Sequence, residues 1–242
     1  MEIIVKVTLI SYTQNAVDLL LFTKSTRLSM SPGLMAEIAE WPEEKKNAEL
    51  AYMAETIPSS WEFVDYVFMI EGVSRAFTHQ FVRTRMGSYA QQSMRVTEMF
   101  DYTYVATDAI NASREACLIV TNANKAIRNA YVQLMEAGMA AEDARGILPT
   151  NIATNIVAKF NLRTLAELAR SRTGGRTQGE YQKVANAMID AVLDAHPWAE
   201  KFFFSKDRNY FDEIESFAKA KFPDLKERGE LLKIVDKMRK EK

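Results

Sequence analysis

Arginines and neutral hydrogen-bonding side chains gather in one acid-free stretch of this 242-residue sequence. Residues 72–97 contain no aspartate, glutamate or lysine, but they hold Arg75, Arg83, Arg85 and Arg95. Between these arginines lie Ser88, Tyr89, Gln91, Gln92 and Ser93. A guanidinium offers a planar set of donors that matches phosphate and carboxylate groups, and neutral amides and hydroxyls suit sugars and bases. The stretch therefore predicts a concentrated anion-binding site.

A second arginine-rich segment, residues 144–179, contains a single acidic residue, Glu167. Its basic residues are Arg145, Lys159, Arg163, Arg170, Arg172 and Arg176. The whole chain is nearly neutral, with 31 basic and 32 acidic residues. The two segments therefore indicate a local anion site rather than the broad basic surface of a protein that coats nucleic acid. The alternative is that these arginines pair with acids elsewhere in the chain or across an oligomer interface, and the sequence leaves both open.

The scarce residue types exclude several kinds of chemistry. One cysteine, Cys117, rules out an intramolecular disulfide and a cysteine-rich zinc site. Two histidines, His79 and His196, leave little room for a histidine-based metal centre or a catalytic triad, so we expect no metal. No Walker loop or GxGxxG motif is present, which leaves phosphates to side chains and loop amides. The start lacks a signal peptide and no apolar run approaches ~20 residues, so we expect a cytoplasmic protein without membrane contact.

Patterning along the chain predicts an α+β domain with more helix than strand. β-branched and aromatic residues predict strands over residues 2–10 and 61–71 and an extended segment over 94–105. Helical spacing, caps and breakers predict helices over residues 15–27, 42–55, 74–85, 108–137, 142–147, 155–172 and 177–195. The last twenty residues are rich in charges of both signs. We therefore expect one domain over residues 1–222 and a charged tail or helix over 223–242.

The first arginine-rich stretch also resembles a family signature. Arg83-Thr84-Arg85 is followed, after seven residues, by Ser93, Met94 and Arg95. This spacing resembles the signature of flavin-dependent thymidylate synthases, whose usual Arg-His-Arg reads Arg-Thr-Arg here. Other segments resemble the same family in order and spacing: Ser59-Ser60-Trp61-Glu62, residues 144–151 and 161–165, Arg172, and Gln178-Gly179-Glu180. The resemblance extends from residue 1 to about residue 200.

The resemblance implies a fold, a reaction and an assembly. The fold is expected to be a single α+β domain with a mixed or antiparallel sheet packed against long helices. Such enzymes convert dUMP to dTMP with methylenetetrahydrofolate as the carbon donor and FAD and NADPH as the hydride source, without a cysteine nucleophile. They are homotetramers with sites at subunit interfaces. The expected partners are therefore dUMP, folate and further copies of the chain, not nucleic acid.

Residue roles follow from the resemblance position by position. It implies that FAD contacts Ser59, Arg83, Thr84, Arg85, Gln91, Asn161 and Arg163. It implies that dUMP contacts Gln80, Gln91, Gln92, Ser93, Met94, Arg95, Arg145 and Arg172. Arg172 is expected at the uracil ring as the catalytic residue, because a guanidinium there stabilises negative charge that develops on the pyrimidine.

Several positions depart from the family pattern, all on the flavin and folate side. Histidine is replaced by Thr84, by Phe63 after Glu62 and by Ile57-Pro58, and Glu167 stands where histidine or asparagine is expected. One interpretation is that FAD is held differently, by Arg83, Arg85, Arg163 and Arg176. The others are a related pyrimidine nucleotide hydroxymethylase, or a nucleotide- or nucleic-acid-binding protein without catalysis.

Four further residues are open to a structural or a functional interpretation. Cys117 lies in an apolar helical segment, so a buried, inert thiol is expected. His79 and His196 are expected to pack or form hydrogen bonds within the fold. Glu180 is expected either to pair with an arginine or to act as a carboxylate of the site.

Overall fold

The structure, a computed structural model, describes residues 5–25, 31, 33–173, 178–204, 214, 217–218, 221 and 225–240. The chain divides into two units, Met1–Phe203 and Phe204–Lys242. Helix α12 (Leu225–Lys240) belongs to the second unit. The expected helix ends at 26–27 and 177, and Arg176, lie outside the described residues. All residues discussed below as a site belong to the first unit.

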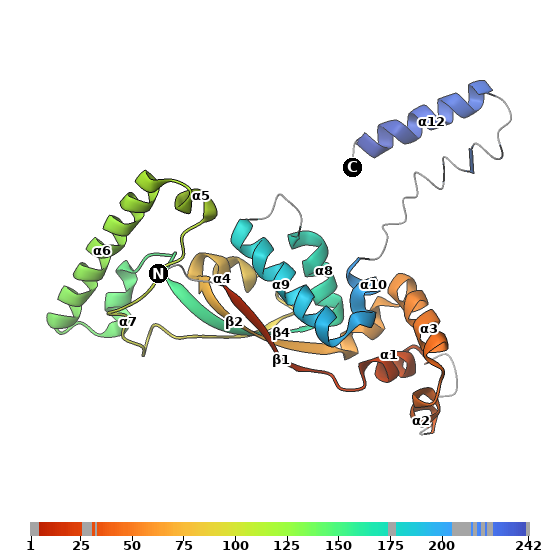
Figure 1. Ribbon diagram of the computed structural model, residues 1–242, viewed down its shortest axis with the longest axis horizontal. Coiled ribbons are helices and arrows are strands. Elements are labelled where there is room, and N and C mark those ends of the chain that lie inside the picture. The colour runs from red at the N-terminus through yellow and green to blue at the C-terminus, as the bar shows by residue number, and fades with distance from the viewer. Residues whose placement is uncertain are drawn as a thin grey trace. The chain divides into compact units, whose positions relative to one another are not determined.

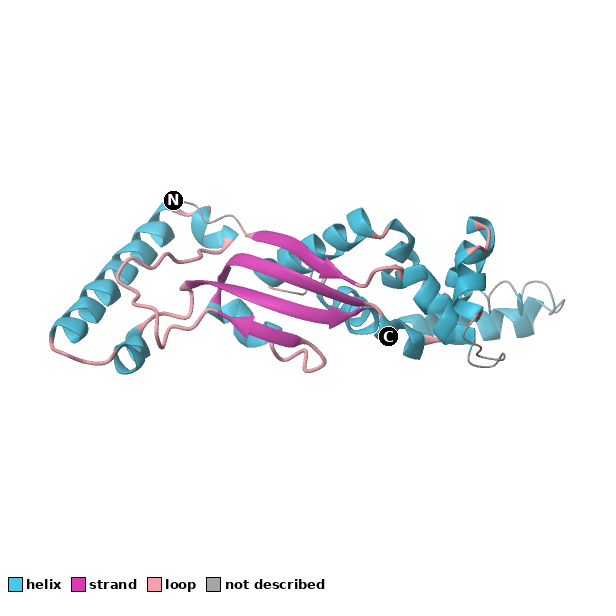
Figure 2. Cartoon of the chain, turned by 90° about the horizontal axis from the view of Figure 1, so that it is seen from below, coloured by secondary structure: helices cyan, strands magenta, loops and turns pink. Residues whose placement is uncertain are grey.

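An antiparallel sheet of four strands forms the centre of the first unit (Figure 2). The strand order is β1-β2-β4-β3, with bounds β1 Lys6–Tyr12, β2 Asp65–Ser74, β3 Ser88–Gln91 and β4 Ala153–Asn161. Burial alternates along most of the two central strands, and the buried side chains include Tyr66, Phe68 and Ile70 of β2 and Ile156, Ala158 and Phe160 of β4. A pleated strand sends successive side chains to opposite faces. One face of the sheet therefore lies in the hydrophobic core.

Three helices pack against this buried face: α4 (Arg75–Phe81), α8 (Leu162–Arg172) and α9 (Gly179–Ala195) (Figure 1). Phe81 of α4 packs edge-to-face against Phe160 of β4 and Tyr181 of α9, with ring centroids 5.5 and 5.9 Å apart. Edge-to-face contacts of this kind add to the free energy gained by burying the rings. They hold the end of α4 against both the sheet and α9.

The other elements of the first unit extend from the two ends of the sheet (Figure 1). At one end are α1 Ala16–Lys24, α2 Leu34–Ala39, α3 Glu43–Thr56, η2 Pro58–Phe63, η4 Pro197–Ala199 and α10 Glu200–Phe203. At the other are α5 Asp108–Asn111, α6 Arg114–Glu136, α7 Ala141–Ala144 and η3 Arg145–Ile147. Helix α6 is 23 residues long, yet Leu118 and Ile119 on it are 56% and 62% exposed.

The largest difference from the sequence-based expectation is in residues 155–172, which were expected to form one helix. Their first part belongs to strand β4, and only Leu162–Arg172 is helical. β4 pairs with β2 on one side and β3 on the other. This pairing stabilises an extended backbone despite residues such as Asn155 and Ala158 that disfavour strands. Asn161 then caps α8, accepting a hydrogen bond from Thr164 N at 2.9 Å.

Other boundaries also differ from expectation. The helix expected over 74–85 ends at Phe81, and a short strand, β3, follows it. The segment 94–105 was expected to be extended but forms no strand. Its β-type pairing is limited to an isolated bridge between Tyr104 and Ile152. The helix expected over 108–137 is two helices, because Ser113 starts α6 as its N-cap, accepting from Ala116 N at 3.2 Å. Residues Pro58–Phe63 form a 3₁₀ helix, so β2 begins at Asp65 rather than at 61.

The α+β class, with an antiparallel sheet and packed helices, is confirmed. Within the described ranges, no helix combines the length and the apolar character needed to cross a membrane. The same ranges contain no group of histidine, cysteine, aspartate and glutamate side chains arranged to hold a metal ion.

Candidate active site

The start of α4 is fixed by a carboxylate from α9. Ser74 caps α4, because its Oγ accepts a hydrogen bond from Phe77 N at 3.0 Å. Both Ser74 N and Ser74 Oγ donate to the carboxylate of Glu180, each at 2.6 Å. One turn further along α4, Gln80 Nε2 donates to Gln178 Oε1 at 3.0 Å. Glu180 therefore fixes the N-terminal cap of α4, and together with Gln178 it links α4 to the start of α9.

The turn after α4, residues 82–87, carries the Arg83-Thr84-Arg85 motif. Arg83 and Arg85 are exposed, and no hydrogen bond or ion pair is recorded for either guanidinium among the residues that the structure describes. Because neither guanidinium has such a partner, both can bind an anionic ligand.

This turn and helix α8 enclose a cavity of about 280 Å³, which we call the turn cavity. It is lined by Thr84, Arg85, Met86, Thr164, Glu167, Leu168, Ser171 and Arg172. Arg85 comes from the first arginine-rich segment and Arg172 from the second. Arg172 lies over the ring of Tyr181, with its Cζ 4.9 Å from the ring centroid, which favours the cation and orients it. The fold thus brings the two segments together at one cavity.

Arg163 has a different environment from Arg172. Its Nη1 lies 2.7 Å from Glu62 Oε1, and its Nε lies 3.3 Å from Glu167 Oε1. Hydrogen bonds with Glu62 first, and then with Glu167, raise the pKa of the Arg163 guanidinium above its usual value. For this arginine the pairing alternative raised by the sequence holds. Its guanidinium therefore already has two carboxylate partners before any ligand binds.

Other residues expected to contact the flavin lie outside the lining of the turn cavity. Ser59 is exposed on η2, and the side-chain oxygen of Asn161 is engaged as the cap of α8. Gln91 Nε2 donates to Thr78 Oγ1 at 2.9 Å. Of the seven residues expected at the flavin, the described lining contains Thr84 and Arg85.

On the nucleotide side, Arg95 and Arg145 converge on Glu142. Arg95 Nε lies 2.6 Å from Glu142 Oε2, and Arg145 Nε donates to the carbonyl of Glu142 at 3.1 Å. Ser93 Oγ accepts a hydrogen bond from Arg95 N at 3.1 Å. Two arginines that are 50 positions apart in sequence therefore meet at Glu142, Arg95 through its carboxylate and Arg145 through its backbone carbonyl.

Arg75 belongs to this cluster, although sequence reasoning gave it no role. Its Nη2 donates to Gln92 O at 2.6 Å, and its buried Nε lacks an acceptor among the described residues. Burial, followed by the nearby charge of Arg145, lowers the pKa of the Arg75 guanidinium. The sequence signal that could have identified Arg75 is its place in the acid-free stretch over residues 72–97.

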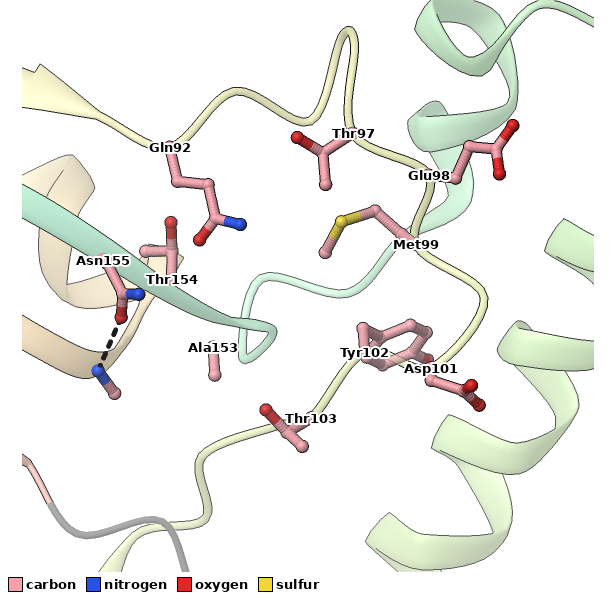
Figure 3. A pocket seen from close by; sticks show the side chains of 11 residues that line it. Gln92, Thr97, Glu98, Met99, Asp101, Tyr102, Thr103, Ala153, Thr154 and Asn155 are labelled. Carbon is pink, nitrogen blue, oxygen red and sulfur yellow. Dashed lines mark hydrogen bonds between the residues drawn. The ribbon is translucent and has the colours of Figure 1, made fainter.

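A second cavity of about 330 Å³, the loop cavity, is shown in Figure 3, and its lining includes Gln92, whose carbonyl accepts the hydrogen bond from Arg75. It is lined by Gly72, Gln92, Thr97, Glu98, Met99, Asp101, Tyr102, Thr103, Ala153, Thr154 and Asn155. Figure 3 shows that Gln92 and Met99 point into the cavity, whereas the carboxylates of Glu98 and Asp101 point away from it. Gly72 has φ of 70°, a conformation that glycine adopts without strain. Its N–H donates to Asn155 Oδ1 at 3.0 Å, where the β2–β4 register shifts.

The histidines and the cysteine lie away from both cavity linings. Tyr66 Oη and His196 Nδ1 are 3.1 Å apart, and burial lowers the pKa of His196, so this histidine has the expected structural role. His79 is exposed on α4. Cys117 is half-buried rather than fully buried, and its Sγ donates to Ile110 O at 3.1 Å.

A family model described as thymidylate synthase complementing protein matches residues 8–198, which is most of the chain. The chain belongs to the flavin-dependent thymidylate synthase family.

Similar proteins support this assignment, and each is described as a flavin-dependent thymidylate synthase. The protein of Nitratidesulfovibrio vulgaris is 32% identical over 237 residues, covering 90% of this chain and 95% of its own length. That of Clostridium tetani is 33% identical over 211 residues, covering 80% and 84%. That of Sulfolobus acidocaldarius is 36% identical over 137 residues, covering 57% of this chain and 53% of its own, so the chain matches about half of that relative. The family expected from the sequence is therefore confirmed.

Flavin-dependent thymidylate synthases use FAD, and NADPH and methylenetetrahydrofolate are general requirements of the class. The residues around the turn cavity fit an anionic, hydrogen-bonding cofactor. In the lining of this cavity, Arg85 and Arg172 supply cations without a recorded carboxylate partner in the part of the chain that is described, and Thr84 and Thr164 supply hydroxyls. The turn cavity, at about 280 Å³, is slightly smaller than typical ligand pockets, which span ~300–1,000 Å³.

Proposed function

We propose that this chain catalyses the reductive methylation of dUMP to dTMP. Methylenetetrahydrofolate supplies the carbon, and FAD and NADPH supply the hydride. The observation that carries the proposal is the turn cavity, where Arg85 and Arg172 from two separate arginine-rich segments line one space. The family to which the chain belongs is the second support.

Arg172 is the residue that we assign to catalysis. No carboxylate pairs with its guanidinium among the described residues, and the ring of Tyr181 supports it from one side. A guanidinium held next to the uracil ring stabilises negative charge on the pyrimidine when C5 becomes nucleophilic. Because such a group is held in place before the reaction, little reorganisation is needed in the transition state.

FAD is proposed to lie along the 82–87 turn. Arg83, Thr84 and Arg85 are assigned to its phosphates and ring edges, with Ser59, Gln91, Asn161 and Arg163 around them. Thr84 donates one hydrogen bond where the family usually has an imidazole. Because Glu62 and Glu167 compensate Arg163, the net positive charge toward FAD comes mainly from Arg83 and Arg85.

The nucleotide is proposed to lie on the other arginine cluster. Arg95 and Arg145 are assigned to the phosphate of dUMP because the fold brings both side chains to Glu142; the phosphate replaces the Glu142 carboxylate as the partner of Arg95. Gln80, Gln91, Gln92, Ser93 and Met94 are assigned to the sugar and base, together with Arg172. Gln92 points into the loop cavity (Figure 3), which supports its part in this site.

The reaction is proposed to proceed without a cysteine nucleophile. Cys117 lies on α6 and donates to Ile110 O, and it is in neither described cavity lining. A free thiol with this hydrogen bond behaves as a small packed side chain.

The assembly is proposed to be a homotetramer in the cytoplasm, with sites completed by neighbouring subunits. The support is the small volume of the turn cavity and the exposed apolar residues Leu118 and Ile119 on α6. Exposed apolar surface of this kind marks association sites. The enzymatic domain is proposed to span residues 1–222, followed by a charged segment over 223–242.

The test is to purify the full chain, add FAD and record the visible spectrum. The protein is then incubated with methylenetetrahydrofolate, NADPH and either dUMP or dCMP, and mass spectrometry identifies the product. We expect bound flavin absorbance and dTMP formed from dUMP. No flavin absorbance after FAD addition, together with no dTMP, contradicts the proposal.

Two other outcomes identify the alternatives that the departures from the family pattern raise. A product that carries a hydroxymethyl group indicates a pyrimidine nucleotide hydroxymethylase. Binding of dUMP without any product indicates a nucleotide-binding protein that lacks catalysis.

A further inference from the structure

The backbone of the 82–87 turn is held by a side chain from the strand that follows it. Tyr89 of β3 points back to the turn, and its hydroxyl contacts Thr84 O at 2.7 Å and Phe81 O at 3.1 Å. A phenol has one proton to donate, so the two carbonyls share it. Each of them also accepts a backbone bond: Phe81 O from Thr84 N at 3.1 Å, and Thr84 O from Gly87 N at 3.0 Å. The carbonyls of Phe81 and Thr84, which stand on either side of Val82 and Arg83, each accept one backbone N–H and share the single proton of Tyr89.

The hydroxyl fits in this place because residue 87 is glycine. A Cβ at Gly87 would lie 2.6 Å from Tyr89 Oη and 2.5 Å from Phe160 Cε1. Both distances are far below van der Waals contact. The Tyr89 ring also packs edge-on against Phe81 and Phe160, with centroids 5.5 and 5.7 Å apart. Gly87, Tyr89 and Phe160 therefore form one packed unit behind the turn.

The hydroxyl remains a donor throughout the usual pH range. Burial raises the pKa of Tyr89 well above its ordinary value, although the hydrogen bond with Thr84 opposes this. A protonated phenol is what the two carbonyls require, since neither can donate to it.

The front of the same turn faces the turn cavity. Thr84 and Arg85 line that cavity opposite Arg172. Arg83 and Arg85 have no recorded side-chain partner among described residues. The position of these side chains therefore depends on the backbone of the turn, and the Tyr89 hydroxyl stabilises that backbone through its hydrogen bonds with Phe81 O and Thr84 O.

We propose that Tyr89 is a positioning residue for the flavin, acting through the carbonyls of Phe81 and Thr84 rather than by contact with the cofactor. The inference rests on the proposed function, which places FAD along this turn. A site works when its contacting residues are locked by the hydrogen bonds of a second layer. Loss of the hydroxyl leaves the fold and the ring packing intact but gives the turn more freedom.

The test compares Tyr89→Phe with Tyr66→Phe. Each variant removes one phenol hydroxyl, together with its hydrogen bond, from a strand of the sheet. In the control, this is the hydrogen bond between Tyr66 Oη and His196 Nδ1, which are 3.1 Å apart. Tyr66 is absent from the described lining of the turn cavity, so it serves as the matched control. The measurements are the Kd of FAD by titration of the apo-protein, hydrogen exchange of the Thr84 and Gly87 amides, and the thermal midpoint.

For Tyr89→Phe we expect the Kd of FAD to rise about five-fold, as the loss of one ordinary hydrogen bond allows. Exchange of the Gly87 amide is expected to accelerate in this variant. Tyr66→Phe is expected to lower the thermal midpoint to a similar degree, with wild-type FAD affinity and wild-type exchange at Gly87.

An unchanged Kd of FAD in Tyr89→Phe overturns the inference, and so does an equal loss of affinity in both variants, which indicates a general effect of stability. Wild-type protein that binds no FAD contradicts the proposed function instead. The exchange measurement still reports, in that case, whether the hydroxyl holds the turn.

Discussion

Arg163 and Arg172 lie on the same helix, yet their surroundings give them different chemistry. Arg163 is paired with Glu62 and Glu167, so the field that it presents to a ligand is weak. Arg172 lies over the ring of Tyr181 and lines the turn cavity. An unpaired guanidinium in a partly enclosed site acts on nearby charge through a lower effective dielectric. At the residue scale, these surroundings support the catalytic role that we propose for Arg172.

Replacing Arg172 with alanine is expected to lower kcat by about a hundred-fold, because it removes a charge that acts most strongly in the transition state. Binding of dUMP is expected to weaken far less. Product formation at saturating dUMP and the Kd of dUMP are the two measurements. Arg170→Ala is the control, since Arg170 Nη2 donates to Phe202 O at 3.2 Å and is outside the described cavity lining. Unchanged kcat in Arg172→Ala removes this residue from the catalytic role.

His196 predicts a pH dependence of stability. Burial lowers its pKa in the folded protein below the ordinary value of 6.5, so the unfolded chain binds a proton more readily. The free energy of unfolding is therefore expected to fall as pH drops below 6.5 and to be retained above it. Chemical denaturation between pH 5 and pH 8 measures the free energy of unfolding as a function of pH.

His196→Asn is expected to reduce the dependence of this free energy on pH, and the exposed His79→Gln is expected to retain it. An equal pH dependence in both variants argues against His196 as its source.

At the scale of elements, the decisive segment is β4 followed by α8. A chain with Asn155, Ala158 and Lys159 favours a strand weakly, and the helical spacing of the next residues extends back into it. Pairing with β2 and β3 on both sides decides the conformation, because each pair adds ladder hydrogen bonds that are distant in sequence. The same strand carries Asn161 to the start of α8, so it also sets where Arg163 and Arg172 lie. Local patterns cannot show such a distant partner.

The turn between α4 and β3 supplies a test of packing at this scale. Gly87→Ala is expected to lower the free energy of unfolding by about 1–3 kcal/mol, the usual cost of overpacking a filled site. The reason is the contact of the new Cβ with Tyr89 and Phe160. Gly146→Ala is the control, because no atom lies within 4 Å of the Cβ it would add. Urea denaturation compares the two, and equal stability of both variants contradicts the packing argument.

At the scale of the whole molecule, the single chain leaves α6 with exposed apolar residues and offers a turn cavity that is small for a dinucleotide. Both features are explained by the proposed homotetramer, in which a neighbouring subunit covers apolar surface and completes the site. An amphipathic helix this long is stabilised mainly by packing against a partner surface.

Ile119→Asp is expected to dissociate the assembly, since it places a charge in apolar contact surface. Native mass spectrometry and size-exclusion chromatography measure the change. Ile119→Val keeps the surface apolar and is expected to remain a tetramer. A wild-type monomer, or a tetramer in both variants, argues against this face of α6 as part of the interface.

The sequence by itself was enough to indicate the family, which is confirmed, and to predict an anion site. Its two acid-poor arginine segments, its single cysteine and the spacing from Arg83 to Arg95 indicated an anion site and the family, because residue type and spacing are local properties. Only the tertiary structure decided which arginines remain unpaired. Glu62 and Glu167 compensate Arg163, Glu142 joins Arg95 and Arg145, and Glu180 holds the cap of α4. The physical reason is that ion pairs and strand pairings join residues that are distant along the chain, and packing of the complete core selects among them.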